Sequence, residues 1–189
     1  MTSVVVTPPA LEPVTVAQMR NQLRLTGAQE EDLLTGLIQA ARQQIERETR
    51  RALIRQGWRL YLEAWPMGRI VSLPIAPVLS VDEITVYDLD GNGHVLDPSD
   101  YTLDRSSDPA RIRIGLGAGG PAASLLGAEI DFSAGYGDNG QDVPAPLRQA
   151  IRLLAAHWFE NREAGTDLAM TSLPHGLDRL MSVNRVLQL

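Results

Sequence analysis

The sequence predicts an α+β fold, with a small helical domain, an inserted antiparallel β block and an extended C-terminal tail. Apolar residues recur at helical spacing near both ends of the 189-residue chain. Between about residues 58 and 136, short alternating segments are separated by Pro and Gly, which is typical of strands and turns. Because the strands do not alternate with helices, a doubly wound parallel sheet is excluded. We expect the domain to span residues 1–165 and the tail residues 166–189.

Two helices are predicted before the β block. Thr15 and Gln18 have the spacing of a capping box, which predicts a helix over about residues 15–25. A second helix is predicted over about residues 29–53, with acidic residues at its start and arginines near its end, as the helix dipole favours. Its apolar face comprises Leu33, Leu34, Leu37, Ile38, Ala41 and Ile45.

The segment "DLDGNG" lies between the strand-like segments "EITVY" and "HVLD" and predicts a hairpin turn. Asp88, Asp90 and Asn92 also match the first ligand positions of a calcium loop. However, Ser99 stands where that loop needs a glutamate, and the flanking segments resemble strands rather than helices. A hairpin is therefore favoured over a metal site.

A third helix is predicted over about residues 145–163, opened by Pro144 and Pro146. The tail that follows carries many large apolar side chains, and burying each of them is worth about 1.5–3 kcal/mol. We therefore expect them to pack, either on their own domain or on a partner. They are Leu168, Met170, Leu173, Leu177, Leu180, Met181, Val183, Val186, Leu187 and Leu189.

Composition excludes several kinds of chemistry. The chain has no cysteine, and its 17 basic residues are all arginine. Disulfides, thiolate sites and a phosphate-loop lysine are therefore absent, and the glycine-rich segment 115–120 is interpreted as a loop between strands. The net charge of −6 argues against a nucleic-acid binder. No membrane span or signal peptide is predicted. The histidines, His94, His157 and His175, have no metal-ligand spacing, and we predict no catalytic, cofactor or metal site.

An ordered set of segments resembles one protein family. The set includes "EEDLLTGLIQAARQQIERETRRAL", "LPIAPVLSVDEITVYDLDGNG", "DYTLD", "SAGYGDNGQDVPAPLRQAIRLLAAHWFENREA" and "LPHGLDRLMSVNRV". Together they resemble the head–tail connector (adaptor) proteins of long-tailed phages and of phage-derived gene transfer agents. The resemblance extends over nearly the whole chain after about Leu11. The alternatives are another head-completion part, such as a stopper or tail terminator, or a small enzyme.

The resemblance implies a non-enzymatic virion protein at the head–tail junction, assembled in the bacterial cytoplasm. Its partners would be the portal protein, a tail-side stopper or head-completion protein, and further copies of itself in a ring, usually twelve-fold. DNA would pass through the channel without specific binding. The expected portal-binding residues of the tail are Leu173, Pro174, Leu177, Leu180, Met181, Val183, Arg185, Val186, Leu187 and Leu189.

Charged helix residues offer a second kind of contact. We expect Arg148, Arg152 and Arg162 to pair with acidic residues of the neighbouring subunit, namely Glu30, Glu31 and Asp32, unless these side chains form only a solvated surface.

Overall fold

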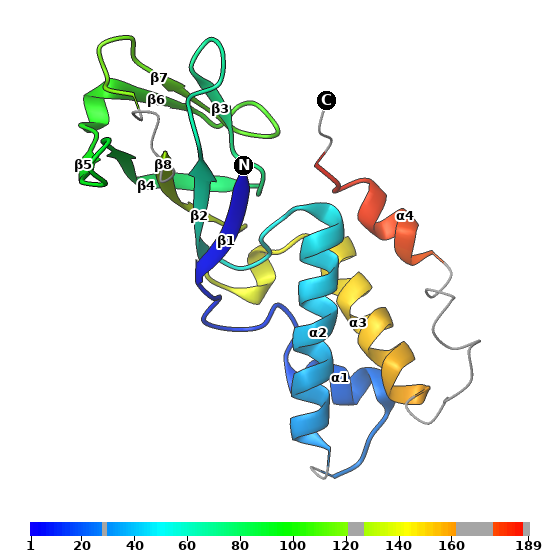
Figure 1. The fold of residues 1–189 in the computed structure, drawn as a ribbon. Coiled ribbons are helices and arrows are strands. Elements are labelled where there is room, and N and C mark those ends of the chain that lie inside the picture. Colours follow the sequence, from blue (N-terminus) through cyan, green and yellow to red (C-terminus); the bar gives the residue numbers. More distant parts are fainter. Residues whose placement is uncertain (28–29, 121–126, 162–175, 187–189) are drawn as a thin grey trace. The chain divides into compact units, whose positions relative to one another are not determined.

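The computed structural model describes residues 1–27, 30–120, 127–161 and 176–186. These residues form two compact units, each built from separate stretches of chain. The β unit contains Met1–Pro9 and Arg55–Gly135, with Val186, and the helical unit contains Ala10–Ile54 and Tyr136–Arg185. Figure 1 shows the strands and the helices gathered in these two units. The predicted α+β class is confirmed, whereas the predicted boundary at residue 165 stays a prediction because it lies outside the described residues.

The β unit contains a five-stranded and a three-stranded sheet, in which all strand pairs are antiparallel. The larger sheet has the order β1 (Thr2–Thr7), β2 (Gln56–Leu62), β8 (Ala128–Ala134), β4 (Val78–Tyr87) and β5 (Gly93–Val95). The smaller has the order β3 (Ile70–Ser72), β7 (Arg111–Ile114) and β6 (Tyr101–Asp104), with a short 3-10 helix, Pro98–Asp100, just before β6.

The alternation of side chains along β8 shows which of its faces is buried. Along β8, Ala128, Ile130, Phe132 and Ala134 are buried, and the residues between them are partly exposed. This period of two is the pattern expected of a strand with one face on a core. On the opposite face, Arg59 of β2 binds both carboxylate oxygens of Asp131 at 2.6 and 2.7 Å.

β1 was not predicted. Its apolar run, Val4 to Val6, lacks the alternation that signals a half-buried strand, and these side chains are indeed 40–55% exposed. The strand forms because β2 provides a ladder for it, from Thr2 opposite Tyr61 to Thr7 opposite Gly57. Tertiary pairing, rather than local pattern, therefore determines this element.

The helical unit contains α1 (Val16–Leu23), α2 (Glu31–Thr49), α3 (Ala145–Glu160), α4 (Leu177–Ser182) and a 3-10 turn, Gly140–Asp142. The predicted capping box is confirmed, since Thr15 and Gln18 exchange two hydrogen bonds of 3.2 Å. The core between the helices is formed by Val14, Met19, Leu34, Ile38, Ala41, Ile45, Leu53, Ile54, Val143, Leu147, Ala150, Ile151, Leu154, Ala155, Leu177 and Met181.

The first helices end earlier than predicted. Arg24 and Arg50 adopt left-handed backbone conformations, with φ of 56° and 57°, which stop α1 and α2. Such a conformation is a common helix end, although glycine is its usual residue, so the sequence did not show these stops. The chain from Ala52 to Ile54 is instead non-helical and fully buried, which explains why its apolar side chains resembled a continuing helix.

Candidate functional site

The predicted tail residues fall into a buried and an exposed group. Leu177 and Met181 belong to the core of the helical unit, with exposures of 0% and 1%. Val186 is also buried, Leu180 is half-buried, and Val183 is 85% exposed. α4 therefore packs on its own unit through one face and leaves the other face free. Among the apolar side chains in the described part of the tail, Val183 is therefore the most accessible to a partner.

Hydrogen bonds attach the end of α4 to the end of α2. Arg185 donates from Nε to the carbonyl of Glu48 at 3.1 Å. Arg51 donates in the same way to the carbonyl of Asn184. Arginines that bind the last carbonyls of a helix satisfy acceptors that the helix itself leaves unpaired. Arg185, predicted as a portal contact, thus has a role within the subunit.

Not all of the predicted contact residues belong to the described part of the chain. Leu173, Pro174, Leu187 and Leu189 of the tail lie outside the described residues, as does Arg162. Their proposed contacts remain predictions.

The predicted basic residues of α3 lie one turn apart and are half-buried. The Nε atoms of Arg148 and Arg152 are buried and have no hydrogen-bond partner. Within the described part of the chain, neither side chain forms an ion pair. Like charges at this spacing repel each other, and Arg148 also lies in the first turn of α3, where the helix dipole disfavours a cation. Among the described residues, no carboxylate offsets these two positive charges.

Arg148 lines a groove of about 390 Å³ in the helical unit. The groove lies between the chain before α1, one side of α2 and the turn before α3, and it offers mostly apolar surface. A side chain at position 140 would meet the carbonyl of Pro13 at 2.7 Å, so Gly140 permits the close packing that shapes one wall. The lining residues are Leu11, Glu12, Pro13, Val14, Thr15, Val16, Gln18, Thr35, Ile38, Gly140, Gln141 and Arg148.

The predicted acidic residues differ from one another. Glu30 is half-buried at the start of α2. Glu31 pairs with Arg20 of its own subunit at 3.1 Å. Asp32 is exposed and forms no ion pair or side-chain hydrogen bond with the described residues. Of the three, Asp32 is therefore the carboxylate most available to another molecule.

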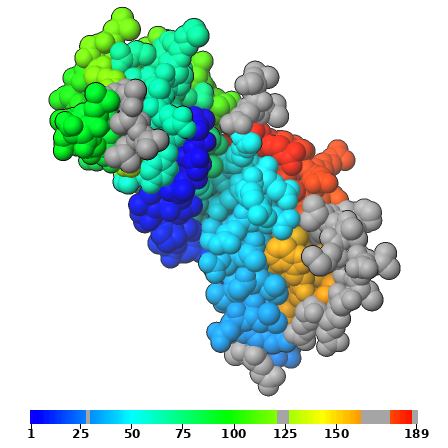
Figure 2. Space-filling model, viewed as in Figure 1, coloured from blue at the N-terminus to red at the C-terminus, as the bar shows by residue number. Residues whose placement is uncertain are grey.

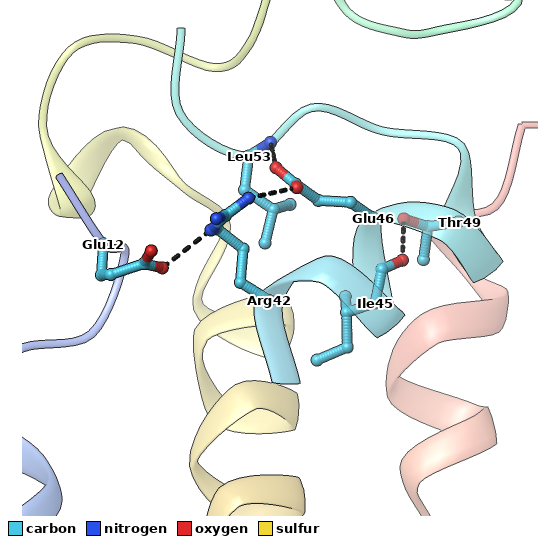
Figure 3. A network of polar contacts seen from close by, with 6 residues as sticks. All are labelled: Glu12, Arg42, Ile45, Glu46, Thr49 and Leu53. Carbon is cyan, nitrogen blue, oxygen red and sulfur yellow. Dashed lines mark hydrogen bonds and ion pairs between the residues drawn. The ribbon is translucent and has the colours of Figure 1, made fainter. Parts of the chain in front are cut away.

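A buried charge network was not predicted. Arg42 of α2 is only 4% exposed and binds Glu12 at 2.8 Å and Glu46 at 2.6 Å. Glu46 also accepts the backbone N–H of Leu53 at 2.8 Å, which fixes the buried segment after α2 (Figure 3). Burial alone would lower the pKa of Arg42, but the bond to Glu12 and the charge of Glu46 outweigh it and raise that pKa. The spacing of Arg42 and Glu46 was a signal for one of these contacts, whereas Glu12 is 30 residues away.

The aspartate-rich turn is a hairpin, as predicted. Asp88 accepts the N–H groups of Asp90 and Asn92, both at 2.9 Å, between β4 and β5. Hydrogen bonds from Asn92, then from His94 and Asp90, lower the pKa of Asp88 to about 2. The lone pairs that a free carboxylate would offer to a metal are thus occupied by the turn itself. No group of three potential metal ligands occurs among the described residues.

The glycine-rich segment after β7 is held by Arg69, which the sequence did not indicate. Arg69 donates to the carbonyls of Leu116, Ala118 and Gly119, at 3.2, 2.6 and 3.1 Å from its Nη atoms. A phosphate-binding loop presents N–H groups to its ligand. Here carbonyl oxygens converge on the guanidinium of Arg69, so these contacts fix the shape of the loop.

None of the helices in the described ranges is long and apolar enough to cross a membrane.

The described residues thus combine two units, a groove with an arginine that has no ion pair among them, and a C-terminal helix with one exposed face. The chain matches the family described as "Phage gp6-like head-tail connector protein" over residues 13–91 and 120–185. It therefore belongs to that family, as the resemblance in its sequence implied.

Solved structures support the same assignment. A chain from the neck of an empty GTA particle computed with C6 symmetry is 33% identical, with a TM-score of 0.83. A chain from the virion of a native gene transfer agent (GTA) particle is also 33% identical, with a TM-score of 0.82. A chain from a native GTA neck computed with C12 symmetry is 32% identical, with a TM-score of 0.82. Each alignment covers 100% of this chain and 97% of the other. No curated protein matches the chain.

Proposed function

We propose that this protein is a non-enzymatic subunit of a connector ring at the head–tail junction of a phage-like particle, assembled in the bacterial cytoplasm. In this role it binds the portal, extends the DNA channel and docks the tail-side stopper or head-completion protein. The observation that carries the proposal is the full-length structural match to chains from GTA necks, together with the family match.

The symmetry of the related necks supports a ring of copies. One related neck was computed with C6 symmetry and another with C12 symmetry. A closed ring requires each subunit to present two different surfaces, one to each neighbour. Two surfaces of the helical unit are candidates for these contacts. One is the accessible outer side of α2 (Figure 2), and the other is the groove lined by Thr35, Ile38 and Arg148.

The negative net charge of the chain is compatible with a place in the wall of a DNA channel. Each phosphate contact made by a basic side chain adds salt-dependent affinity for DNA. A chain with a net charge of −6 offers little overall attraction to a polyanion. DNA is therefore expected to pass through the ring without being held.

We propose that the exposed side of α4, rather than the whole tail, meets the portal. Leu177 and Met181 already contribute to the subunit's own core, so removing the whole tail would damage the fold as well as any docking surface. Val183 lies on the same short helix region but is 85% exposed. A charge at Val183 would disturb a docked partner without disturbing this core.

The test is the mass of the complex formed with the portal protein encoded by the same genome. The unmodified chain should form a large complex of defined mass. Val183→Asp should weaken that complex, whereas Leu89→Asp, at a position 74% exposed in the β4–β5 turn, should not. Failure of the unmodified chain to join the portal would refute the proposed function. Equal binding by Val183→Asp would refute the role of α4.

A further inference from the structure

We infer that the Arg148 groove receives the start of α2 from a second copy of this chain, with Asp32 pairing with Arg148 and Leu33 covering the apolar wall. This inference rests on the proposed ring and names the contact that closes it.

The groove specifies what its occupant must offer. Its wall contains Leu11, Val14, Val16 and Ile38, and an apolar side chain laid there would be removed from water. Its carboxylate, Glu12, is already bound by Arg42 at 2.8 Å. Arg148 is consequently the charge in the groove without a partner among the described residues. The groove therefore fits a segment with one large apolar side chain next to one carboxylate.

Arg152 is a second reason why the occupant of the groove should carry a carboxylate. It follows Arg148 by one helical turn, and its Nε is likewise buried without a hydrogen bond. A carboxylate placed near this pair would offset both their mutual repulsion and the unfavourable dipole of the first turn of α3. The described part of the subunit does not provide that carboxylate, whereas a neighbouring copy can bring one.

The start of α2 has the complementary chemistry. Within the described helical unit, the exposed large apolar side chains are Leu11, Leu33 and Val183. Leu11 belongs to the groove itself. Val183 is followed closely by Arg185 and lies one turn from Arg179, both basic, and would bring positive charge towards Arg148. Leu33 is preceded by Asp32, which has no partner among the described residues, so its charge matches the groove.

Leu33 and the part of the groove wall that α2 provides lie on different sides of that helix. Thr35 and Ile38 line the groove. At 3.6 residues per turn, Leu33 points roughly 140–200° away from these two residues around the helix axis. A subunit cannot place its own Leu33 against the wall formed by Thr35 and Ile38, but a neighbour can. This is the head-to-tail geometry that a ring requires.

Charge exchange tests the contact. Arg148→Glu and Asp32→Arg each place like charges at every junction of a ring, and repulsion between like charges across an interface costs several kcal/mol. Each variant alone should lose assembly with the portal by about tenfold or more. Leu33→Ser should weaken assembly less, because it removes only apolar contact.

A mixture of the two charge variants is the decisive sample. In an alternating ring, the glutamate introduced by Arg148→Glu meets the arginine introduced by Asp32→Arg, and the remaining junctions keep the original Arg148 with the original Asp32. All junctions are then matched, and the C12 symmetry of a related neck provides the even subunit number that alternation needs. Mixing two inactive variants should thus restore assembly. Rescue also shows that both variants fold, which circular dichroism checks separately.

Matched controls carry the same charge changes elsewhere. Arg113→Glu and Glu63→Arg alter exposed side chains of the β unit and should assemble as the unmodified chain does. The inference is overturned if either Arg148→Glu or Asp32→Arg assembles normally, or if their mixture remains inactive. If the unmodified chain itself forms no ring with the portal, the proposed function fails, which is a different result.

Discussion

Arg42 and Arg148 both belong to helices of the helical unit, yet their charges are treated in opposite ways. Arg42 is 4% exposed and held by two carboxylates of its own chain. Arg148 is half-buried and has no ion pair among the described residues. Burying a charge is costly unless it is paired. The difference indicates that Arg42 serves the fold of the subunit, whereas Arg148 is available for the contact with a second copy that we propose.

Replacing Arg42, the paired arginine, should reduce the stability of the subunit more than any other change proposed. Arg42→Ala leaves Glu12 and Glu46 without their buried partner, and breaking a buried pair costs about 3–5 kcal/mol. For a chain of this size, the melting temperature should fall by roughly 6–20 °C. Thermal unfolding followed by circular dichroism measures this. Arg24→Ala, at an exposed position, should change stability by less than about 0.5 kcal/mol. A similarly small effect of Arg42→Ala would remove the distinction between the two arginines.

If α4 stabilises the subunit's own fold, as Arg42 does, emptying its buried face should destabilise the subunit. Leu177→Ala empties a fully buried position and should destabilise the subunit by about 2–5 kcal/mol in urea unfolding. Val183→Ala, on the exposed side, should stay within about 0.5 kcal/mol of the unmodified chain. If both variants unfold alike, α4 does not pack on the helical core in solution.

Removing one of the two arginines of α3 that have no ion pair among the described residues should have the smallest effect on stability, and it should stabilise the subunit rather than destabilise it. Arg152→Gln removes a like charge one turn from Arg148, a repulsion worth about 0.2–0.5 kcal/mol on a helix. The isolated subunit should therefore become slightly more stable in urea unfolding at low salt. Arg148→Gln should do the same. Destabilisation beyond about 1 kcal/mol would mean that these arginines have partners within their own subunit, contrary to the proposed interface.

The sequence predicted those elements whose structure is determined by residues close together in the chain. The apolar periodicity of α2 and α3, the capping box at Thr15 and the hairpin turn at Asp88 were all recognisable, because neighbouring residues decide them. β1 was missed because its ladder comes from β2, about fifty residues later in the chain. The stops at Arg24 and Arg50 were missed because arginine is not the residue usually found in a left-handed helix end.

For the candidate site, the sequence predicted the residues but not their burial or their partners. The sequence named Arg148 and Asp32 but equally allowed a solvated surface, and it could not divide the tail into buried and exposed side chains. Which charges are already satisfied depends on contacts such as Glu12 with Arg42, and no local pattern contains that information. The structure separates Glu31, which has Arg20, from Asp32, which lacks a partner among the described residues.

The interleaving of the two units also bears on how the chain is made by the ribosome. The first strand cannot pair until β2 has been made, and the last strand of the β unit, β8, ends only at Ala134. The apolar faces of α1 and α2 emerge early, but α3, which covers them, begins only at Ala145. Neither unit can therefore be completed during synthesis until most of the chain has been translated. Partly made chains expose apolar helix faces for that interval, which is when aggregation competes with folding.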